Sequence, residues 1–331
     1  MTSHVRWGIL SAANIAVKSF LPAVKQSETA VVVAVASRNE EKARSFADEH
    51  GIERAYGSYE QLLQDPDIDA VYIPLPNHLH AEWTIRAAQA GKHVLCEKPL
   101  AISEEEAARA VTACKKEGVQ LTEAFMYRHH PRYDQIKACI AAGEIGDIRG
   151  LYANFTFDKH TDTDNVRFQK KMGGGSLYDV GCYPISAARY VLEREPEAVA
   201  VQAFFSEDHD DVDMMASGLI EFPNQVGLTF QCGMWAERRN NLLIIGSEGS
   251  IEVPSAFIYD PDNRHFYVSV KGERREVEVP EVNHYTLQLD DFGRSILEGR
   301  SPRFPAEDSL LNMRVIEACL RSARNRERIH L

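Results

Sequence analysis

The chain has 331 residues, 44% of them hydrophobic, and a formal net charge of −12 at pH 7. This length exceeds what one hydrophobic core usually serves, so two domains are expected, and the negative charge disfavours nucleic acid as a partner. The longest apolar run, 30–36, is strand-sized rather than membrane-spanning, and the first residues lead into a strand without the features of a secretory leader, which predicts a cytoplasmic protein with no membrane partner.

Six cysteines are scattered widely along the chain. No two of them have the close spacing that holds zinc or a redox disulfide. We therefore expect thiols in a reducing compartment rather than disulfide bonds.

Residues up to about 124 alternate short β-branched runs with helical patterns. Strands are predicted at 5–10, 31–37, 70–73, 93–96 and 119–122, and helices at 40–50, 80–90 and 104–116. Ser103 and Glu106 form a capping box at the start of the last helix. This alternation is typical of a parallel sheet, so residues 1–124 are predicted to form an α/β Rossmann domain.

After about residue 126 strands dominate. They are predicted at 148–158, 199–206, 215–222, 225–234, 241–245, 250–253, 266–270 and 275–279, with helices at 133–142, 176–192, 285–298 and 306–325. The short turns between strands favour antiparallel hairpins. Residues 125–331 are therefore predicted to form an α+β domain with a large open, mostly antiparallel sheet, whose C-terminal helix could pack back on the first domain.

The first predicted strand ends in a turn of small residues. Ser11, Ala13 and Ala16 stand where a dinucleotide fingerprint has glycine, glycine, and glycine or alanine. Small residues let the backbone approach a pyrophosphate, and the helix that begins near Asn14 and Ile15 would point its positive end at that anion. By itself this pattern fits a tight turn in another α/β protein equally well.

The end of the second strand bears on the choice of dinucleotide. NAD-binding proteins usually place an acidic residue there for the ribose 2′-hydroxyl, whereas this chain has Ser37 and Arg38, which suit a 2′-phosphate. An exposed arginine can also be only a solvated charge. The sequence therefore favours NADP and leaves NAD possible.

Three motifs carry the remaining signal. Glu97-Lys98-Pro99 follows a strand at the carboxyl edge of the predicted sheet, where open α/β folds bind ligands. The segment 74–80 follows the preceding strand, and a glycine run at 173–175 leads into Asp179 and Tyr183. In this order and separation the motifs resemble the glucose-fructose oxidoreductase, inositol dehydrogenase and MocA family, and the resemblance covers nearly the whole chain.

The resemblance implies a catalytic role for Lys98, Asp179 and Tyr183. Asp179 and Tyr183 are four residues apart and so share a helix face. Inositol dehydrogenase-like members carry histidine at the position of Tyr183, so this chain looks closer to the dihydrodiol and aldose (xylose) dehydrogenases. We expect Tyr183 to exchange a proton with the substrate oxygen, Lys98 to favour the ionised tyrosine and hold that oxygen, and Asp179 to orient sugar or diol hydroxyls. A buried aromatic with no chemical role is the alternative for Tyr183.

The resemblance also implies contacts that a structural role could equally explain. Predicted cofactor contacts are Pro74, Asn77, His78, Glu97 and Arg128, and predicted substrate contacts are Arg128, Arg167 and Trp235. Trp235 is as readily a core residue as a sugar platform. The histidines at 78, 80, 129 and 130 lack ligand spacing, so no metal is expected.

These observations together predict an NAD(P)-dependent oxidoreductase. It would transfer hydride between nicotinamide and a carbinol or carbonyl of an aldose such as D-xylose or glucose, or of a trans-dihydrodiol. A non-catalytic dinucleotide-sensing regulator and a redox-neutral, NAD-dependent glycoside hydrolase are the alternatives. Because family members pair through the sheet of the second domain, a homodimer or homotetramer is expected.

Overall fold

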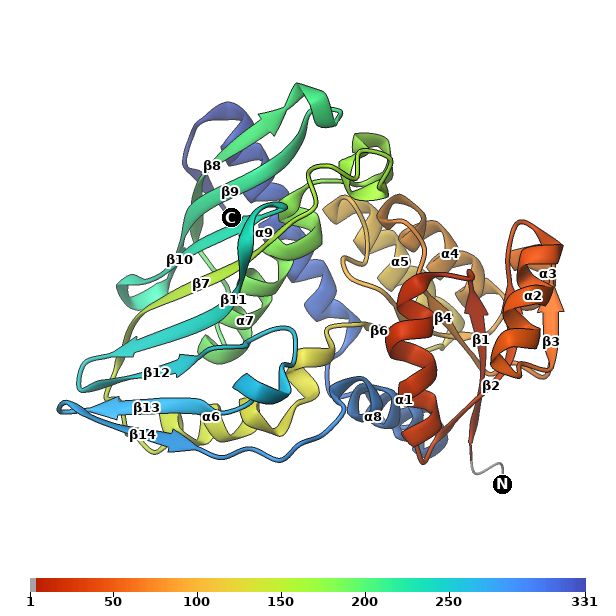
Figure 1. The fold of residues 1–331 in the computed structure, drawn as a ribbon, viewed down its shortest axis with the longest axis horizontal. Helices are drawn as coiled ribbons and strands as arrows, with labels where there is room; N and C mark the ends of the chain where they lie inside the picture. The colour runs from red at the N-terminus through yellow and green to blue at the C-terminus, as the bar shows by residue number, and fades with distance from the viewer. Residues whose placement is uncertain (1–3) are drawn as a thin grey trace. The chain divides into compact units, whose positions relative to one another are not determined.

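A computed structural model describes residues 4–331, and the chain in it divides into two compact units (Figure 1). The first unit runs to Met126 and also contains Asn283–Leu310; the second comprises Tyr127–Val282 and Leu311–Leu331. The sequence places one boundary near residue 124, whereas the structure returns one later segment to the first unit. No helix in the described range is long and apolar enough to cross a membrane.

The first unit is built on a six-stranded parallel sheet in the order β3-β2-β1-β4-β5-β6. This is the Rossmann order, which confirms the predicted fold class. The strands are β1 (Val5–Leu10), β2 (Ala30–Ala36), β3 (Arg54–Tyr56), β4 (Ala70–Ile73), β5 (His93–Cys96) and β6 (Leu121–Glu123). The strand order reverses beside β1, so the turn after β1 lies where such sheets bind their ligands.

Helices connect these strands. They are α1 (Leu21–Gln26), α2 (Glu40–His50), α3 (Tyr59–Leu63), α4 (Asn77–Gln89) and α5 (Glu104–Glu117). Side chains cap the starts of three of them, α2, α3 and α5. The Ser103 hydroxyl accepts a hydrogen bond from the Glu106 amide at 3.2 Å, as the capping-box prediction requires. The Glu106 carboxylate accepts from the Ile102 amide at 3.4 Å, one residue earlier than that motif implies.

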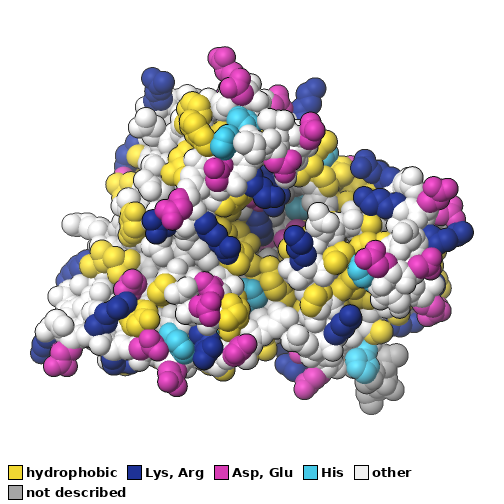
Figure 2. Space-filling model, in the orientation of Figure 1, with side chains coloured by type: hydrophobic (Ala, Val, Ile, Leu, Met, Phe, Trp, Pro, Cys, Tyr) yellow, Lys and Arg dark blue, Asp and Glu magenta, His cyan; other side chains and the backbone are white. Residues whose placement is uncertain are grey.

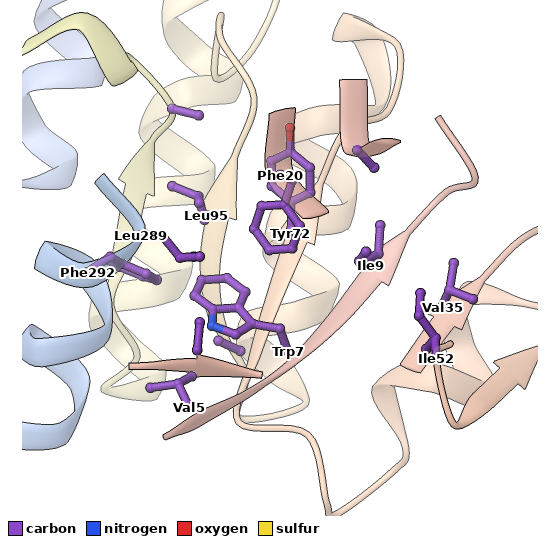
Figure 3. Packing of buried hydrophobic residues seen from close by; sticks show 14 of the residues in the cluster. Val5, Trp7, Ile9, Phe20, Val35, Ile52, Tyr72, Leu95, Leu289 and Phe292 are labelled. Atoms are coloured by element: carbon purple, nitrogen blue, oxygen red, sulfur yellow. The ribbon is translucent and has the colours of Figure 1, made fainter. Parts of the chain in front are cut away.

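The core of the first unit is completed by a helix from late in the chain. Trp7 on β1 packs against Phe20 and against Phe292 of α8 (His284–Glu298), with ring centroids 5.6 and 5.9 Å apart (Figure 3). Leu289 of α8 joins the same cluster. Burying a side chain of this size contributes about 2–3 kcal/mol, so α8 is part of the first unit's stability.

The second unit contains a nine-stranded sheet in the order β14-β13-β12-β11-β7-β10-β9-β8-β15. Its strands are β7 (Ile148–Asp158), β8 (Ala198–Ser206), β9 (Val212–Phe222), β10 (Val226–Gly233), β11 (Trp235–Gly246), β12 (Gly249–Val253), β13 (Phe266–Val270), β14 (Glu273–Val277) and β15 (Ile329–His330). The pairs are antiparallel except β7 with β10, which are parallel. The mostly antiparallel prediction is confirmed.

The two faces of this sheet differ. Helices α6 (Pro131–Ala141), α7 (Cys182–Leu192) and α9 (Ala306–Asn325) belong wholly or largely to this unit, and α7 packs on β7. Along β7, Leu151, Ala153 and Phe155 are buried, whereas Tyr152 between them is 36% exposed. The sheet therefore has a packed face and an open face.

Candidate active site

The turn after β1 has the geometry expected of a dinucleotide loop. Ser11 has a φ of 139°, a conformation that normally favours glycine. Ala13 and Ile15 are partly exposed and Asn14 is exposed, and the chain then enters a π-helical turn, Ala16–Phe20, that continues into α1. Small, accessible residues before a helix start fit the phosphates of NAD or NADP.

The predicted 2′-phosphate residues follow β2. Ser37 is buried and its hydroxyl accepts from the Asn39 amide at 3.3 Å, while Arg38 is exposed. Burial raises the pKa of Tyr59, while the Arg38 and Ser11 side chains act on its hydroxyl in the opposite direction. The Tyr59 ring packs edge-on against Trp83 with centroids 4.8 Å apart. The structure thus joins Ser11 and Arg38, two residues predicted separately, through Tyr59, which no motif marks.

The segment after β5 carries Glu97, Lys98 and Pro99. The Tyr72 hydroxyl donates to Glu97 Oε1 at 2.6 Å, and the Leu100 amide donates to Glu123 Oε1 at 2.9 Å. Glu97 and Lys98 are each partly exposed. Side-chain and backbone contacts on both sides therefore fix the position from which Lys98 projects.

His80 anchors the same segment from α4. Its two ring nitrogens lie 2.7 Å from the carbonyl oxygens of Pro99 and Leu75. Burial lowers the pKa of His80 to about 4, although both carbonyls act to raise it. A neutral ring carries one N–H and can donate to only one of the two carbonyls, whereas a doubly protonated ring can donate to both. His80 therefore has a structural role in the first unit.

Other predicted cofactor residues lie beside this segment. Pro74 is buried directly after β4, and Asn77 and His78, both partly exposed, form the first turn of α4. Tyr285, at the start of α8, was not predicted as a site residue. Burial and the Glu97 carboxylate raise its pKa, and the Lys98 charge acts in the opposite direction, so both side chains influence Tyr285 electrostatically.

In the second unit the glycine run is required by packing. A Cβ on Gly174 would lie 2.5 Å from the Arg167 carbonyl oxygen, and a Cβ on Gly175, whose φ is 119°, would lie 2.1 Å from Asp213 Oδ1. The Gly175 amide donates to that same Arg167 carbonyl at 2.9 Å. The run therefore holds the Arg167 loop directly against the helix that follows.

That contact creates a charged cluster. Arg167 Nε donates to Asp179 Oδ2 at 2.7 Å, and the Asp179 carboxylate raises the pKa of Arg167. Tyr183 acts on Arg167 in the same direction, so all three predicted residues are within electrostatic reach of one another. The Asp179 side chain is 13% exposed and that of Arg167 is 40% exposed. A solvent-facing cation thus holds a largely buried carboxylate.

Tyr183 is fixed by aromatic packing. Its ring centroid lies 5.2 Å from that of Phe155, 5.6 Å from that of Phe257 and 5.9 Å from that of Tyr127. Tyr183 is only 4% exposed, so its position is set by the packed face of the sheet. A rigid ring is what precise proton exchange requires.

Arg128 and Trp235, two further predicted contacts, differ sharply in exposure. Arg128 is 3% exposed in the 3₁₀ turn Met126–His129. Trp235 is 49% exposed and packs against Phe204, with ring centroids 4.9 Å apart, on the open face of the sheet. Tyr183 contacts Phe155 on the packed face, so the structure does not bring Trp235 together with the Arg167 cluster, and its contact with a sugar stays a prediction.

The histidines have other partners where their contacts are defined. His130 accepts a hydrogen bond from the Arg132 amide at 3.1 Å and caps α6. Across residues 4–331, no group of three or more histidine, cysteine, aspartate or glutamate side chains is arranged to hold a metal ion.

Comparison with protein-family models covers both units. Residues 5–125 match an oxidoreductase family with an NAD-binding Rossmann fold, and residues 133–252 match the GFO/IDH/MocA C-terminal domain. The chain belongs to the GFO/IDH/MocA family. It is therefore an oxidoreductase with an NAD-binding domain, which confirms the predicted family, enzyme class and type of cofactor.

Relatives of this oxidoreductase act on sugars. D-xylose 1-dehydrogenase (NADP(+)) 2 of Haloferax volcanii is 39% identical, covering 96% of this chain and 97% of the relative. An aldose-aldose oxidoreductase from Caulobacter crescentus, solved with glycerol, has a TM-score of 0.93 at 28% identity and covers 99% of this chain and 100% of its own. A 3-ketoreductase from Actinomadura kijaniata, solved with NADP and TDP-benzene, has a TM-score of 0.91 at 33% identity, with coverage of 96% and 98%.

Relatives of this chain also include a dehydrogenase named for a diol. Trans-1,2-dihydrobenzene-1,2-diol dehydrogenase of Xenopus laevis is 36% identical, covering 83% of this chain and 81% of its own. Further structures of the 3-ketoreductase carry single replacements of a tyrosine by phenylalanine and of a lysine by alanine.

Proposed function

We propose that this protein is an NADP-preferring sugar dehydrogenase or reductase. It would transfer hydride between nicotinamide and a carbinol or carbonyl of an aldose such as D-xylose or glucose, or of a trans-dihydrodiol. The observation that carries the proposal is the cluster of Arg167, Asp179 and Tyr183 in a member of a sugar-oxidoreductase family. The names of the xylose and dihydrodiol dehydrogenases support the substrate classes.

In the proposed mechanism Tyr183 handles the proton. In oxidation its oxygen takes the proton from the substrate hydroxyl, and in reduction it returns the proton to the carbonyl oxygen. Bound nicotinamide supplies or accepts the hydride. Lys98 holds the same substrate oxygen and favours the ionised tyrosine. In the related ketoreductase a tyrosine and a lysine were each replaced, which supports the choice of Tyr183 and Lys98 as the residues to test.

Asp179 and Arg167 would bind the rest of the substrate. A carboxylate accepts hydrogen bonds from neighbouring hydroxyls, and the Arg167 contact at 2.7 Å fixes the direction of the Asp179 side chain. The partly exposed Arg167 can donate to a further sugar oxygen. A polyol with adjacent hydroxyls matches this arrangement better than a simple alcohol does.

The preference for NADP rests on the residues after β2. Ser37 and Arg38 offer a hydroxyl and a cation where an acidic residue would repel a 2′-phosphate. The Arg38 and Ser11 side chains both act on the Tyr59 hydroxyl, which supports a position of the guanidinium on the side of the dinucleotide turn. The NADP-linked names of the xylose dehydrogenase and the ketoreductase support this preference.

The test is to mix the protein with NADP or NAD and a panel of aldoses and trans-diols, following nicotinamide absorbance. We expect a substrate-dependent signal that is larger with NADP and that falls by about 100-fold or more in Lys98→Ala and Tyr183→Phe. Tyr190→Phe is the matched control, because Tyr190 lies on the same helix and faces Lys137 instead. Full activity in Tyr183→Phe would show the proton role to be wrong.

A redox-neutral reaction is the second candidate, favoured by the similarity to the aldose-aldose oxidoreductase. In that case hydride would pass from one sugar to another through a retained cofactor, and added NADP would not be reduced in net terms. Conversion of a two-sugar mixture without a change in nicotinamide absorbance would favour it. Tight cofactor binding with no conversion of any kind would favour a sensor.

We also propose that copies of the chain pair through the open face of the second unit's sheet. Five large apolar side chains on it are between 36% and 49% exposed: Tyr152, Phe204, Leu219, Trp235 and Ile245. Exposed apolar side chains gathered on one face often mark an interaction site. Figure 2 shows cationic and anionic side chains interspersed on the face in view. Light scattering distinguishes monomer, dimer and tetramer.

The cysteines bear on the compartment. All six are buried and none forms a disulfide, with every one of them inside the described range. This supports the expectation of a reducing compartment such as the cytoplasm.

A further inference from the structure

The helix that carries Asp179 and Tyr183 begins against a buried carboxylate from another element. Asp213, near the start of β9, is 2% exposed. Its Oδ2 accepts hydrogen bonds from the Ser176 hydroxyl and from the Leu177 amide, each at 2.7 Å. None of the predicted motifs includes Asp213.

This carboxylate replaces the usual cap of the helix. The first amides of a helix need acceptors, and a serine at the cap position normally supplies one with its own hydroxyl. Here the side chain of Ser176 makes no such bond and donates to Asp213 instead, and Asp213 accepts the Leu177 amide in its place. The positive end of the helix favours the ionised carboxylate and so offsets part of the cost of burying it.

The surroundings leave Asp213 little freedom. Its Oδ1 occupies the space that a Cβ on Gly175 would need, and Ser176, which is fully buried, also lies against Cys232, with 3.6 Å between Oγ and Sγ. The Asp213 carboxylate therefore leaves no room for a side chain at Gly175. The contact joins β9 and β10 to the first turn of the helix.

We propose that Asp213 is a positioning residue that sets where Asp179 and Tyr183 stand relative to Arg167. Asp179 follows the bonded Leu177 by two residues, and the backbone of the same glycine run bonds the Arg167 carbonyl. Loss of the anchor would therefore let the start of the helix, with Asp179 on it, move relative to Arg167 and disturb the 2.7 Å ion pair. The proposal rests on the proposed function for its catalytic readout.

Three variants test this role. Asp213→Ala removes both bonds, Ser176→Ala removes one, and Asp213→Asn keeps an oxygen that can accept both. Because a displacement of 1 Å can cost about 100-fold in rate, we expect kcat to fall about 30-fold in Asp213→Ala and about 5-fold in Ser176→Ala. In Asp213→Asn the loss should stay under about 3-fold, and KM for the cofactor should change less than about 2-fold in all three.

Asp290→Ala is the matched control. Asp290 is another buried carboxylate, 6% exposed, and its Oδ1 accepts from Ser27, Glu28 and Thr29 at 2.5, 3.1 and 3.0 Å in the first unit. Its loss should lower thermal stability while leaving kcat unchanged. If Asp213→Ala lowers stability to the same extent and also leaves kcat unchanged, Asp213 is only a structural residue and the proposal is overturned.

Hydrogen exchange gives a readout that does not need turnover. We expect amides in 175–183 to exchange at least about 10-fold faster in Asp213→Ala and in Ser176→Ala, and at the original rate in Asp290→Ala. If the wild-type protein converts no sugar, the proposed function fails, but this measurement still decides whether Asp213 anchors the segment. Unchanged exchange in both variants overturns the proposal. If Asp213→Ala fails to fold, unchanged exchange in Ser176→Ala alone overturns it.

Discussion

Two helices of this protein begin in the same way and for different reasons. In each unit a turn of small residues leads into a five-residue π-helical turn, Ala16–Phe20 in the first and Leu177–Gly181 in the second, and then into an α-helix. π-turns are rare and occur often at functional sites. The small-residue turn of the first unit has no glycine between Gly8 and the helix, whereas that of the second unit has three in a row at 173–175.

The difference shows what each turn must accommodate. Around Ser11 the neighbouring residues are partly exposed, so the small side chains leave room for something outside the protein. Around Gly174 and Gly175 the space is already filled by the Arg167 backbone and the Asp213 carboxylate. Smallness therefore serves ligand approach in the first unit and internal packing in the second.

The largest effect should follow from adding a methyl group to the second turn. In Gly174→Ala the new carbon would meet backbone atoms of Arg167 and Gln169 at 2.5 to 2.9 Å, and backbone cannot yield cheaply. We expect the free energy of unfolding to fall by about 4 kcal/mol, measured by urea denaturation. Gly150→Ala, whose Cβ would meet only one oxygen at 3.4 Å, should change it by less than about 1 kcal/mol. Equal effects would contradict this account.

The second effect concerns pH. Burial raises the pKa of Asp213 to about 6, although the Ser176 hydroxyl, the Leu177 amide and the Arg324 charge lower it; Cys232 also faces this carboxylate. The folded protein thus binds this proton more tightly than the unfolded chain does. The stability from Asp213 is complete below about pH 4 and declines by about 3 kcal/mol as pH rises to about 6.

Comparison with Asp213→Asn isolates this contribution. Over the same pH interval the wild-type unfolding free energy should fall more steeply than that of the variant, which cannot titrate at this position. Parallel profiles would mean that Asp213 stays ionised throughout.

A smaller effect should appear at the first turn. Tyr59→Phe removes the hydroxyl on which the Arg38 and Ser11 side chains act. Because one hydrogen bond is worth about 1 kcal/mol, the ratio of kcat/KM for NADP to that for NAD should fall about 5-fold. Tyr56→Phe is the control, since the Tyr56 hydroxyl bonds Asp65 at 2.8 Å instead. An equal change in both variants would remove Tyr59 from cofactor selection.

The smallest effect is expected for Ser11→Gly. Glycine adopts the φ of 139° without strain, which should raise stability by about 1 kcal/mol, and loss of the serine hydroxyl near Tyr59 offsets part of this gain. Calorimetry should record a slightly higher melting temperature. A clear decrease would mean that the serine hydroxyl matters more than the backbone conformation.

Sequence patterns predicted the large elements and missed those defined by distant contacts. Strongly apolar strands such as β1 and β4 were found, but β3 is three partly buried residues without an apolar run. The parallel pairing of β7 with β10 was missed because turns report only on neighbours along the chain. The returning helix α8 was found as a helix, but its packing on Trp7 was not predicted.

The site followed the same rule. Motifs marked Lys98, Asp179 and Tyr183 because their spacing is local, and the ion pair that joins Arg167 to Asp179 links residues of two such segments. Tyr59 and Asp213 were missed because each acts through partners from other elements. A lone tyrosine after a helix cap, or an aspartate at a strand start, carries no signal until the fold supplies its neighbours.

The return of α8 to the first unit has a consequence for biosynthesis. Nascent chains generally fold domain by domain from the N-terminus while the ribosome is still translating. Here Trp7 packs in one cluster with Leu289 and Phe292 of α8, which follows strands β7 to β14 in the chain. The core of the first unit therefore cannot be completed until those strands and α8 have been translated. The earliest segment to emerge is therefore among the last to be finished, and during that interval its uncovered apolar surface would be a natural client for chaperones.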